Sequence, residues 1–171
     1  MALTDPAHAL DVLAQNLDDG DLSFDNSGLC QITVQDVFVL NLQKVDARRL
    51  RLVTYLDGLV QAMSARFLLN AATANQDGSA GLYSRFGLHK RAGVLCLEEL
   101  LDVTILDADA LEARVLTFTK TAAYWLANAD NLFDDENPLE PLVHHTGSGM
   151  DDAEFQAYAE FADDMSVIVK A

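Results

Sequence analysis

Three apolar segments lie close together between residues 29 and 56, and the links between them are short. Leu29–Val34, Val37–Leu42 and Leu50–Leu56 are rich in branched aliphatic side chains, as β-strands are. A turn signal of aspartate, asparagine, serine and glycine precedes the first segment. Parallel neighbours need a crossover of about a dozen residues or more. The short links therefore favour an antiparallel meander.

A helical pattern precedes the meander. Asp5 is suited to cap a helix, and Pro6 is suited to its first position. Leu10, Leu13 and Leu17 then recur at helical spacing on one face. We expect an amphipathic first helix that packs this face against the sheet.

The meander is followed by a second helix and two more strands. Helical spacing predicts a helix over about Leu59–Asn75, and strands are expected over Leu82–Leu88 and Val94–Leu100. The last helix is expected to begin near Asp107 or Asp109, where the acidic residue three positions after Asp109 is typical of a capping box. The predicted order is α-β-β-β-α-β-β-α. The fold class is α+β, with an antiparallel sheet flanked by helices.

Acidic residues are unevenly distributed along the chain. The sequence has 27 acids and 11 bases, a formal charge of −16. Residues 134–171 hold ten acids and one base, and they include Pro138 and Pro141. We therefore predict a domain over residues 1–132 and an acidic C-terminal extension, with a possible extra helix, over residues 133–171. Such a charge repels nucleic acid and anionic lipid, so neither is an expected partner.

The residues suggest binding rather than a reaction. No phosphate loop, dinucleotide fingerprint or zinc-ligand motif is present, and the pair His144-His145 has no third ligand near it in sequence. Cys30 and Cys96 lie in apolar strands, where a cysteine is usually inert packing, although a cysteine nucleophile remains an alternative. We predict no catalytic residue, metal or cofactor. No basic segment precedes an apolar stretch at the start, and no apolar run is long enough to span a membrane, so we expect a cytoplasmic protein.

The second and third predicted strands are apolar on both faces. Val37 and Val39 lie on one face, while Phe38, Leu40 and Leu42 lie on the other. An antiparallel sheet with one covered face should alternate between apolar and polar residues. Part of the second face is therefore expected to be covered, either by a partner or second protomer or by the chain's own helices or tail.

Several motifs together resemble the class I type III secretion chaperones, the Tir-chaperone family. The segment Leu22–Val34, which leads into Val37–Leu40, is similar to the opening of that family's sheet. Phe67–Ala71 resembles its second helix, and Ala122–Trp125 resembles the aromatic end of its last helix. The similarity extends from about Leu3 to Ala127. The acidic extension and the basic loop His89–Gly93 depart from the family pattern.

The resemblance implies a bacterial cytoplasmic homodimer that binds the N-terminal segment of a secreted effector and keeps it extended, soluble and ready for secretion. The secretion ATPase is a possible further partner. The implied effector contacts are Leu13, Leu17, Ile32, Val34, Val39 and Leu52. The implied dimer contacts are Met63, Phe67 and Tyr83.

Other functions remain open at this stage. They are a general export-control or adaptor protein of the same fold, a small enzyme that uses a cysteine, and a structural dimer without a client. In the extension, Phe155, Tyr158, Ala162 and Met165 fall on one helical face between acids. We expect this segment to dock on the domain and to occlude or extend the effector groove.

Overall fold

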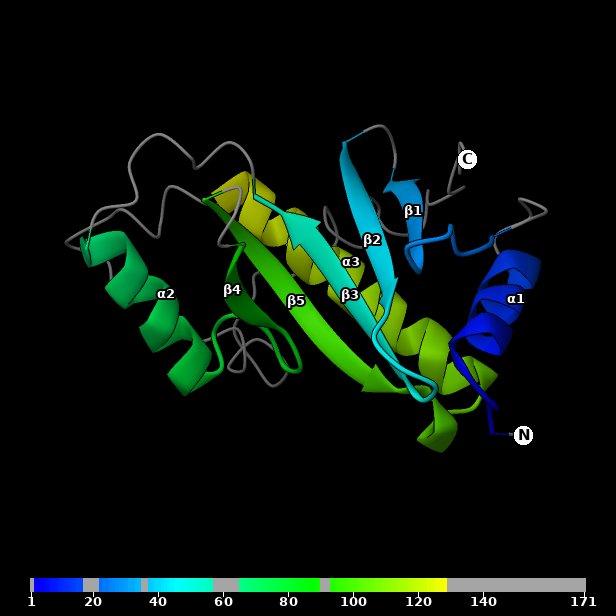
Figure 1. The fold of residues 1–171 in the computed structure, drawn as a ribbon. Coiled ribbons are helices and arrows are strands. Elements are labelled where there is room, and N and C mark those ends of the chain that lie inside the picture. Colours follow the sequence, from blue (N-terminus) through cyan, green and yellow to red (C-terminus); the bar gives the residue numbers. More distant parts are fainter. Residues whose placement is uncertain (1, 17–21, 35–36, 57–64, 90–92, 129–171) are drawn as a thin grey trace. The chain divides into compact units, whose positions relative to one another are not determined.

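The computed structural model describes residues 2–16, 22–34, 37–56, 65–89 and 93–128. Its elements follow the predicted order, with a short 3-10 helix, η2, before the last helix (Figure 1). They are α1 Pro6–Asn16, β1 Leu29–Val34, β2 Phe38–Lys44, β3 Arg49–Tyr55, α2 Ala65–Asp77, β4 Arg85–His89, β5 Val94–Asp102, η2 Val103–Ile105 and α3 Ala108–Asn128. The α+β prediction is confirmed. The extension from residue 133 and its predicted helix lie outside the described residues.

The strands form one antiparallel sheet in the order β1-β2-β3-β5-β4. The meander prediction is confirmed by the register, which pairs Ile32 with Leu40 and Leu42 with Leu52. β4 pairs with β5, and Phe86 lies opposite Leu97. β1 and β4 are therefore the two end strands of the sheet.

Two compact units share this sheet, and each is described separately. The first unit contains α1, β1, β2 and most of β3, together with Glu99–Thr119. The second contains Tyr55–Glu98, with α2 and β4, and the residues of α3 after Thr119. The boundary falls within β5 and within α3, so both units take part of each element.

In the first unit, one face of the meander is buried. Alternate residues of β1 and β2, including Ile32 and Leu40, share this face, because successive side chains of a strand point to opposite sides. Leu10 and Leu13 of α1 and Phe118 of α3 are buried as well. The described part of the apolar stripe predicted for the first helix thus belongs to the core, and burial of such side chains is the main stabilising term.

Caps define where the helices begin. The Asp5 carboxylate accepts hydrogen bonds from the backbone N–H groups of Ala7 at 2.9 Å and His8 at 3.1 Å, as predicted. In α3 the cap is Asp107, whose carboxylate accepts from the N–H of Ala110 at 2.9 Å. The capping box at Asp109 was therefore wrong, because Asp109 already lies in the first turn of α3.

In the second unit, the core forms around an indole. The Trp125 Nε1–H group donates to the Ala80 carbonyl at 3.0 Å, and the Trp125 ring meets Phe86 edge-on with centroids 4.8 Å apart. Gly81 has a φ of +141°, and a β-carbon there would lie 2.8 Å from the Thr121 methyl group. The chain between α2 and β4 is thus held tightly against α3.

The predicted start of the fourth strand differs from the structure. β4 begins at Arg85 rather than at Leu82, because residues 78–84 form a turn, bends and irregular chain instead of a strand. The described part of the second helix begins at Ala65, and residues 57–64 lie outside the described part of the chain.

Candidate functional site

The outer edge of β1 is the first candidate surface. Gly28 accepts a hydrogen bond from the Lys44 N–H group at 2.8 Å, so the residues that bond to β2 are Gly28 and every second residue after it. The backbone groups of Gln31 and Thr33 therefore point away from β2. Because β1 ends the sheet, these groups face outward. Such a row of donors and acceptors is a template for an added strand.

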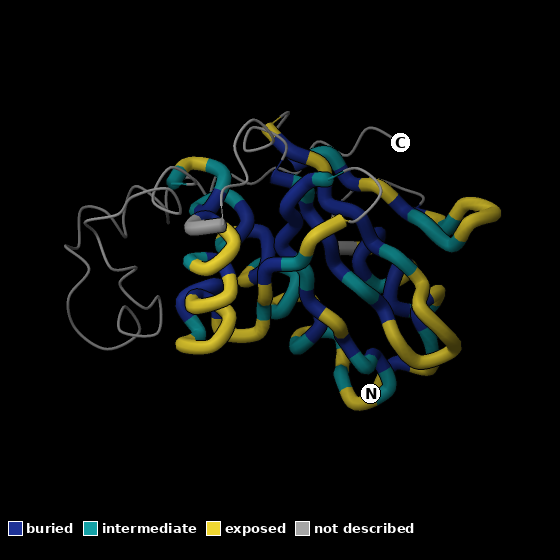
Figure 2. Tube along the Cα trace, turned by 60° about the vertical axis from the view of Figure 1, so that its left-hand side comes forward, coloured by how far each residue is buried: buried dark blue, intermediate teal, exposed yellow. Residues whose placement is uncertain are grey.

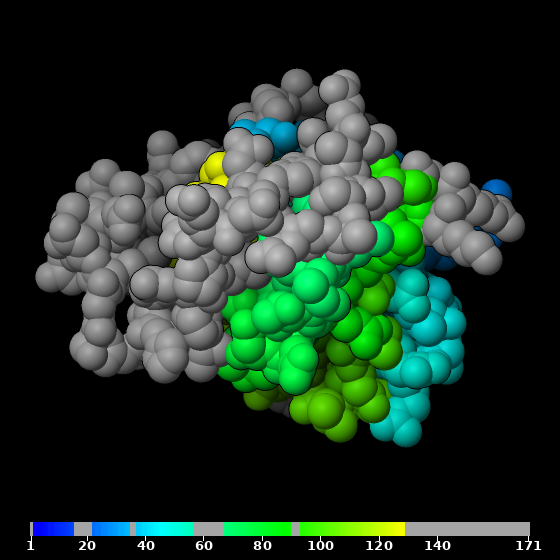
Figure 3. All heavy atoms as spheres, turned by 90° about the vertical axis from the view of Figure 1, so that its left-hand side faces the viewer, coloured from blue at the N-terminus to red at the C-terminus, as the bar shows by residue number. Residues whose placement is uncertain are grey.

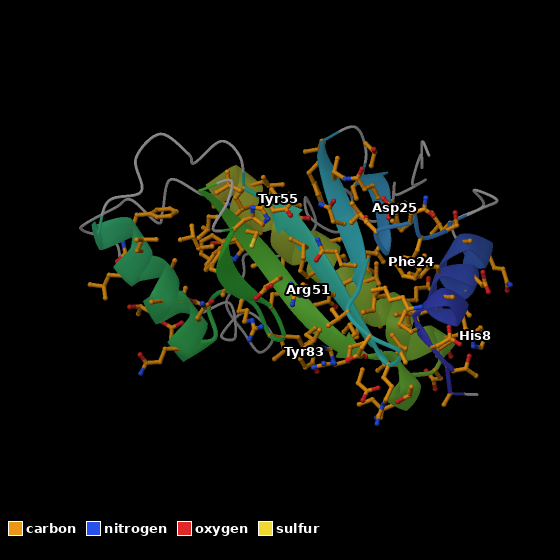
Figure 4. All side chains as sticks on the ribbon, in the orientation of Figure 1. His8, Phe24, Asp25, Arg51, Tyr55 and Tyr83 are labelled. Atoms are coloured by element: carbon orange, nitrogen blue, oxygen red, sulfur yellow. The ribbon has the colours of Figure 1, made fainter. Side chains whose placement is uncertain are left out.

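Asp25, which is labelled in Figure 4 just ahead of β1, sets the start of this edge. Its Oδ1 atom accepts from the N–H of Ser27 at 2.8 Å, the hydroxyl of Ser27 at 2.7 Å and the N–H of Leu29 at 2.9 Å. These hydrogen bonds lower the pKa of Asp25, and the bond from the Ser27 side chain lowers it most. The positive φ of Gly28, +79°, completes the turn. The outward edge is open only beyond Leu29.

The sheet face beside this edge is apolar at one end and polar in the middle. Val37 is 61% exposed and Val39 is 40% exposed, and Val39 lies opposite Thr33. Farther along, the Gln31 side chain donates to Asn41 at 2.8 Å, and the Asn41 amide donates to the Val53 carbonyl at 3.2 Å. The expectation that this face is covered by a partner or by the chain itself stays a prediction at these two valines.

The second candidate surface is on α2, in the other unit. Phe67, Ala71 and Ala74 form the buried stripe, whereas Leu68 and Leu69 are exposed, Leu69 by 58%. Figure 2 shows buried and exposed segments along the tube of the chain. A surface helix normally carries polar residues on the face away from its core. Part of α2 can be seen on the face of the molecule drawn in Figure 3. Exposed apolar side chains grouped in this way indicate a contact surface.

The residues assigned to effector contact separate into exposed and buried ones. Val39 is exposed, whereas Leu13, Ile32, Val34 and Leu52 are buried within the protomer. Leu17 lies outside the described residues. The backbone edge of β1 and the side chain of Val37 were not singled out, although the apolar character of both faces of β2 was a signal for Val37.

The residues assigned to a dimer contact divide similarly. Tyr83 is 51% exposed, Phe67 is fully buried, and Met63 lies outside the described residues. Sequence reasoning missed Leu68 and Leu69. The sequence contained a signal for them, because both leucines directly follow Phe67 and lie outside the helical stripe that begins at Phe67.

One ion pair of the first unit contains a buried carboxylate. Glu99 of β5 is 2% exposed, and its Oε1 atom accepts from Arg114 of α3, with the Nε atom at 2.7 Å. Burial raises the pKa of Glu99, and the hydrogen bond and charge of Arg114 oppose that rise. Within the described segments, the Oε2 atom of Glu99 has no hydrogen-bond partner.

The cysteines are buried, as predicted from their apolar surroundings. Neither Cys30 nor Cys96 forms a disulfide, and Cys96 Sγ donates to the Gly87 carbonyl at 3.3 Å. Burial raises the pKa of the Cys30 thiol. Among the residues described here, no cluster of three or more potential metal ligands occurs, and no helix is long and apolar enough to cross a membrane.

Comparison with known families identifies the chain. The model of the Tir chaperone protein (CesT) family matches residues 8–126, well over half of its length. The chain belongs to this family. The predicted family resemblance is thereby confirmed, and the range matched contains all three helices and all five strands in whole or in part. A comparison with curated protein sequences returns no match.

Solved structures show the same fold at low sequence identity. A chain of the HopA1–SchA chaperone–effector complex is 21% identical, with a TM-score of 0.57, over 70% of this chain and 91% of that chain. A chain of the ExsC–ExsE complex is 20% identical, with a TM-score of 0.58, over 74% of this chain and 96% of that chain. The complex of the Yersinia pestis type III secretion chaperone SycH with a fragment of YscM2 gives 14% identity and a TM-score of 0.54, over 69% and 97% of the two chains.

Proposed function

We propose that this member of the Tir chaperone family is a type III secretion chaperone that binds the N-terminal segment of a secreted effector. Family membership supports this function, as does the shared fold of chains in a chaperone–effector complex and of SycH. The observation that carries the proposal is the outward edge of β1 beside the exposed Val37 and Val39. We assign the chain a binding role and no reaction.

The edge holds an effector segment by strand addition. The outward N–H and C=O groups of Gln31 and Thr33 pair with the backbone of the effector, so recognition needs an extended chain rather than one particular sequence. Apolar effector side chains then cover Val37 and Val39, at a gain of about 25 cal/mol for each Å² of apolar surface removed from water. A segment bonded in this way cannot fold on itself, which keeps it extended for secretion.

The buried members of the assigned contact set support the edge from below. Ile32 and Val34 alternate with the outward residues of β1 and bury their side chains, so they fix the strand that the effector pairs with. Leu13 of α1 and Leu52 of β3 are part of the same unit's core. Val39 is the described member of the set that we expect to touch the effector directly.

A homodimer is the second part of the proposal. The exposed Leu68 and Leu69 of α2, and Tyr83 before β4, offer apolar surface that a second copy would cover. We place the dimer and its client in the bacterial cytoplasm, with the secretion ATPase as the partner to which the client is passed. Light scattering after size-exclusion chromatography should give a dimer mass. Leu69→Asp should give a monomer and Gln76→Asp on the same helix should not, whereas a monomeric wild-type protein would remove this part.

Effector binding can be tested at the edge itself. The chaperone is co-expressed with candidate effectors encoded beside it, and the affinity is measured on the purified complex. Thr33→Pro removes an outward N–H group and leaves the bonds to β2 intact, because proline is tolerated on an edge strand whose N–H faces solvent. We expect at least about a tenfold loss of affinity, since both the donor and room for the added strand are lost. Thr33→Ala is the matched control and should bind like the wild type.

A second variant pair tests the apolar face. Val39→Asp should weaken effector binding about tenfold or more, because a charge would be buried under the effector segment. Val45→Asp places the same charge on another exposed valine of the first unit, away from the β1 edge, and should leave the affinity unchanged. Equal affinities for Val39→Asp, Thr33→Pro and the wild type would refute the proposed site.

A further inference from the structure

The other end of the sheet has an edge as well, and a side chain already occupies it. The backbone N–H of Phe86 in β4 donates to Asn75 Oδ1 at 2.6 Å, and Asn75 Nδ2 donates to the Phe86 carbonyl at 2.9 Å. One carboxamide therefore satisfies both backbone groups of one residue. A neighbouring antiparallel strand would supply the same donor and acceptor to Phe86 from its own backbone.

The register of β4 shows that these groups point outward. Phe86 lies opposite Leu97 of β5, but its N–H and C=O are bonded to Asn75 on the other side of the strand. Hydrogen-bonded and non-bonded pairs alternate along an antiparallel ladder. Phe86 and Leu88 are therefore the residues of β4 whose backbone would receive an added strand. Asn75 fills the first of these two positions.

Asn75 is held in place by its helix. It follows Ala74 on α2, and Phe67, Ala71 and Ala74 form the buried stripe of that helix. Residues three and four apart share a helix face, so Asn75 lies one turn beyond Ala71 at the border of the stripe. The carboxamide is thus positioned before any strand arrives, and an incoming strand must break both of its bonds.

We propose that Asn75 is a specificity-determining residue that closes the β4 edge, so that extended chains add to the β1 edge. The choice of β1 for the effector rests on the function proposed above, whereas the closure of β4 does not depend on it. A chaperone with two open edges would accept a second extended segment or a second copy of itself, because an unprotected edge strand pairs without regard to sequence.

Hydrogen exchange tests the closure directly. In Asn75→Ala, the Phe86 amide proton should exchange about tenfold faster or more than in the wild type, because its acceptor is gone. Asn75→Asp keeps an acceptor for that N–H and loses the donor to the carbonyl, so it should exchange nearly as slowly as the wild type. Gln76→Ala, on the exposed side of α2, is the control and should change nothing. An unchanged Phe86 rate in Asn75→Ala would overturn the proposal.

Strand addition is tested with a labelled probe peptide of alternating threonine and valine with lysine at both ends. Wild type should bind one peptide per protomer and Asn75→Ala two, measured by equilibrium titration of the full chain. If the wild type binds none and Asn75→Ala binds one, the closure stands and the proposed β1 site fails. If both bind the same number, the closure is refuted. Asn75→Ser, which lacks the carboxamide and so loses both bonds to Phe86, supplies the same comparison if Asn75→Ala does not fold.

Discussion

Replacing Arg114 by methionine should destabilise the chain by about 3 kcal/mol at neutral pH. The change removes the partner of Glu99, whose carboxylate is buried and keeps Oε2 without a hydrogen bond in the described part of the chain. Removing one partner of a buried ion pair costs about 3 to 5 kcal/mol. The lower end applies because the Arg114 side chain is itself 26% exposed, so water can reach the site.

The destabilisation should depend on pH in a defined direction. Burial raises the pKa of Glu99 above its ordinary value of 4.5, so the folded state holds its proton to a higher pH than the unfolded state does. Stability contributed by this group is therefore present below pH 4.5 and falls as the pH rises through the folded-state pKa. Without Arg114 that pKa rises further. The difference between wild type and Arg114→Met should be smallest near pH 4 and should grow towards pH 7.

Urea unfolding followed by circular dichroism at several pH values measures this difference. Glu99→Leu combined with Arg114→Met should recover stability to within about 1 kcal/mol of wild type, because an apolar pair removes the buried charge. Lys120→Met, which removes an exposed cation of the same helix, should change stability by less than about 0.5 kcal/mol. A loss for Arg114→Met that is below about 1 kcal/mol, or that is the same at every pH, would refute the reasoning.

Three further predictions follow from the packing of each unit. Trp125→Phe should cost about 1 to 3 kcal/mol in urea unfolding, because the buried Ala80 carbonyl loses its donor; no change would contradict the hydrogen bond. Gly81→Ala should lower stability by about 2 kcal/mol or more, since a β-carbon would meet the Thr121 methyl group in a backbone conformation that favours glycine. The Cys30 thiol should resist alkylation, followed by mass spectrometry, until the chain unfolds, because burial raises its pKa; rapid alkylation of the folded chain would contradict this.

Controls are available within the same chain. Gly93 also has a positive φ, +67°, but a β-carbon there would contact no described residue within 4 Å. Gly93→Ala should therefore cost only the conformational strain of about 1 to 2 kcal/mol. If Gly81→Ala lowered the free energy of unfolding no more than Gly93→Ala does, the predicted clash with the Thr121 methyl group of α3 would be refuted.

The order of the elements could be predicted from the sequence because each signal was local. Short links favoured the meander, and Asp5 with Pro6 marked the start of α1. Where two acids competed, as at Asp107 and Asp109, sequence spacing could not decide, since the cap is chosen by where the chain turns. The start of β4 was missed because apolar Leu82 lies in a bend before the strand.

The candidate surfaces were less predictable because they depend on which strands end the sheet. Leu13 and Val39 are both apolar at regular spacing, yet one is buried and the other is exposed. Strand order decides the outcome, and it brings together segments such as β3 and β5 that are far apart in the sequence. The polar Asn75 beside Ala74 was the visible sign of an edge contact, but its partner Phe86 could be found only in the folded chain.

The buried Asn41 fixes the register of the strand with which a client pairs. Its amide links Gln31 of β1 to the Val53 carbonyl of β3, so three strands are tied at one rung. A slip of β1 or β2 by one residue would leave this amide unpaired and would turn every apolar side chain of the slipped strand to the opposite face. β1 is thus held in a single register. Each client therefore pairs with a strand whose side chains alternate between the two faces of the sheet in the same order.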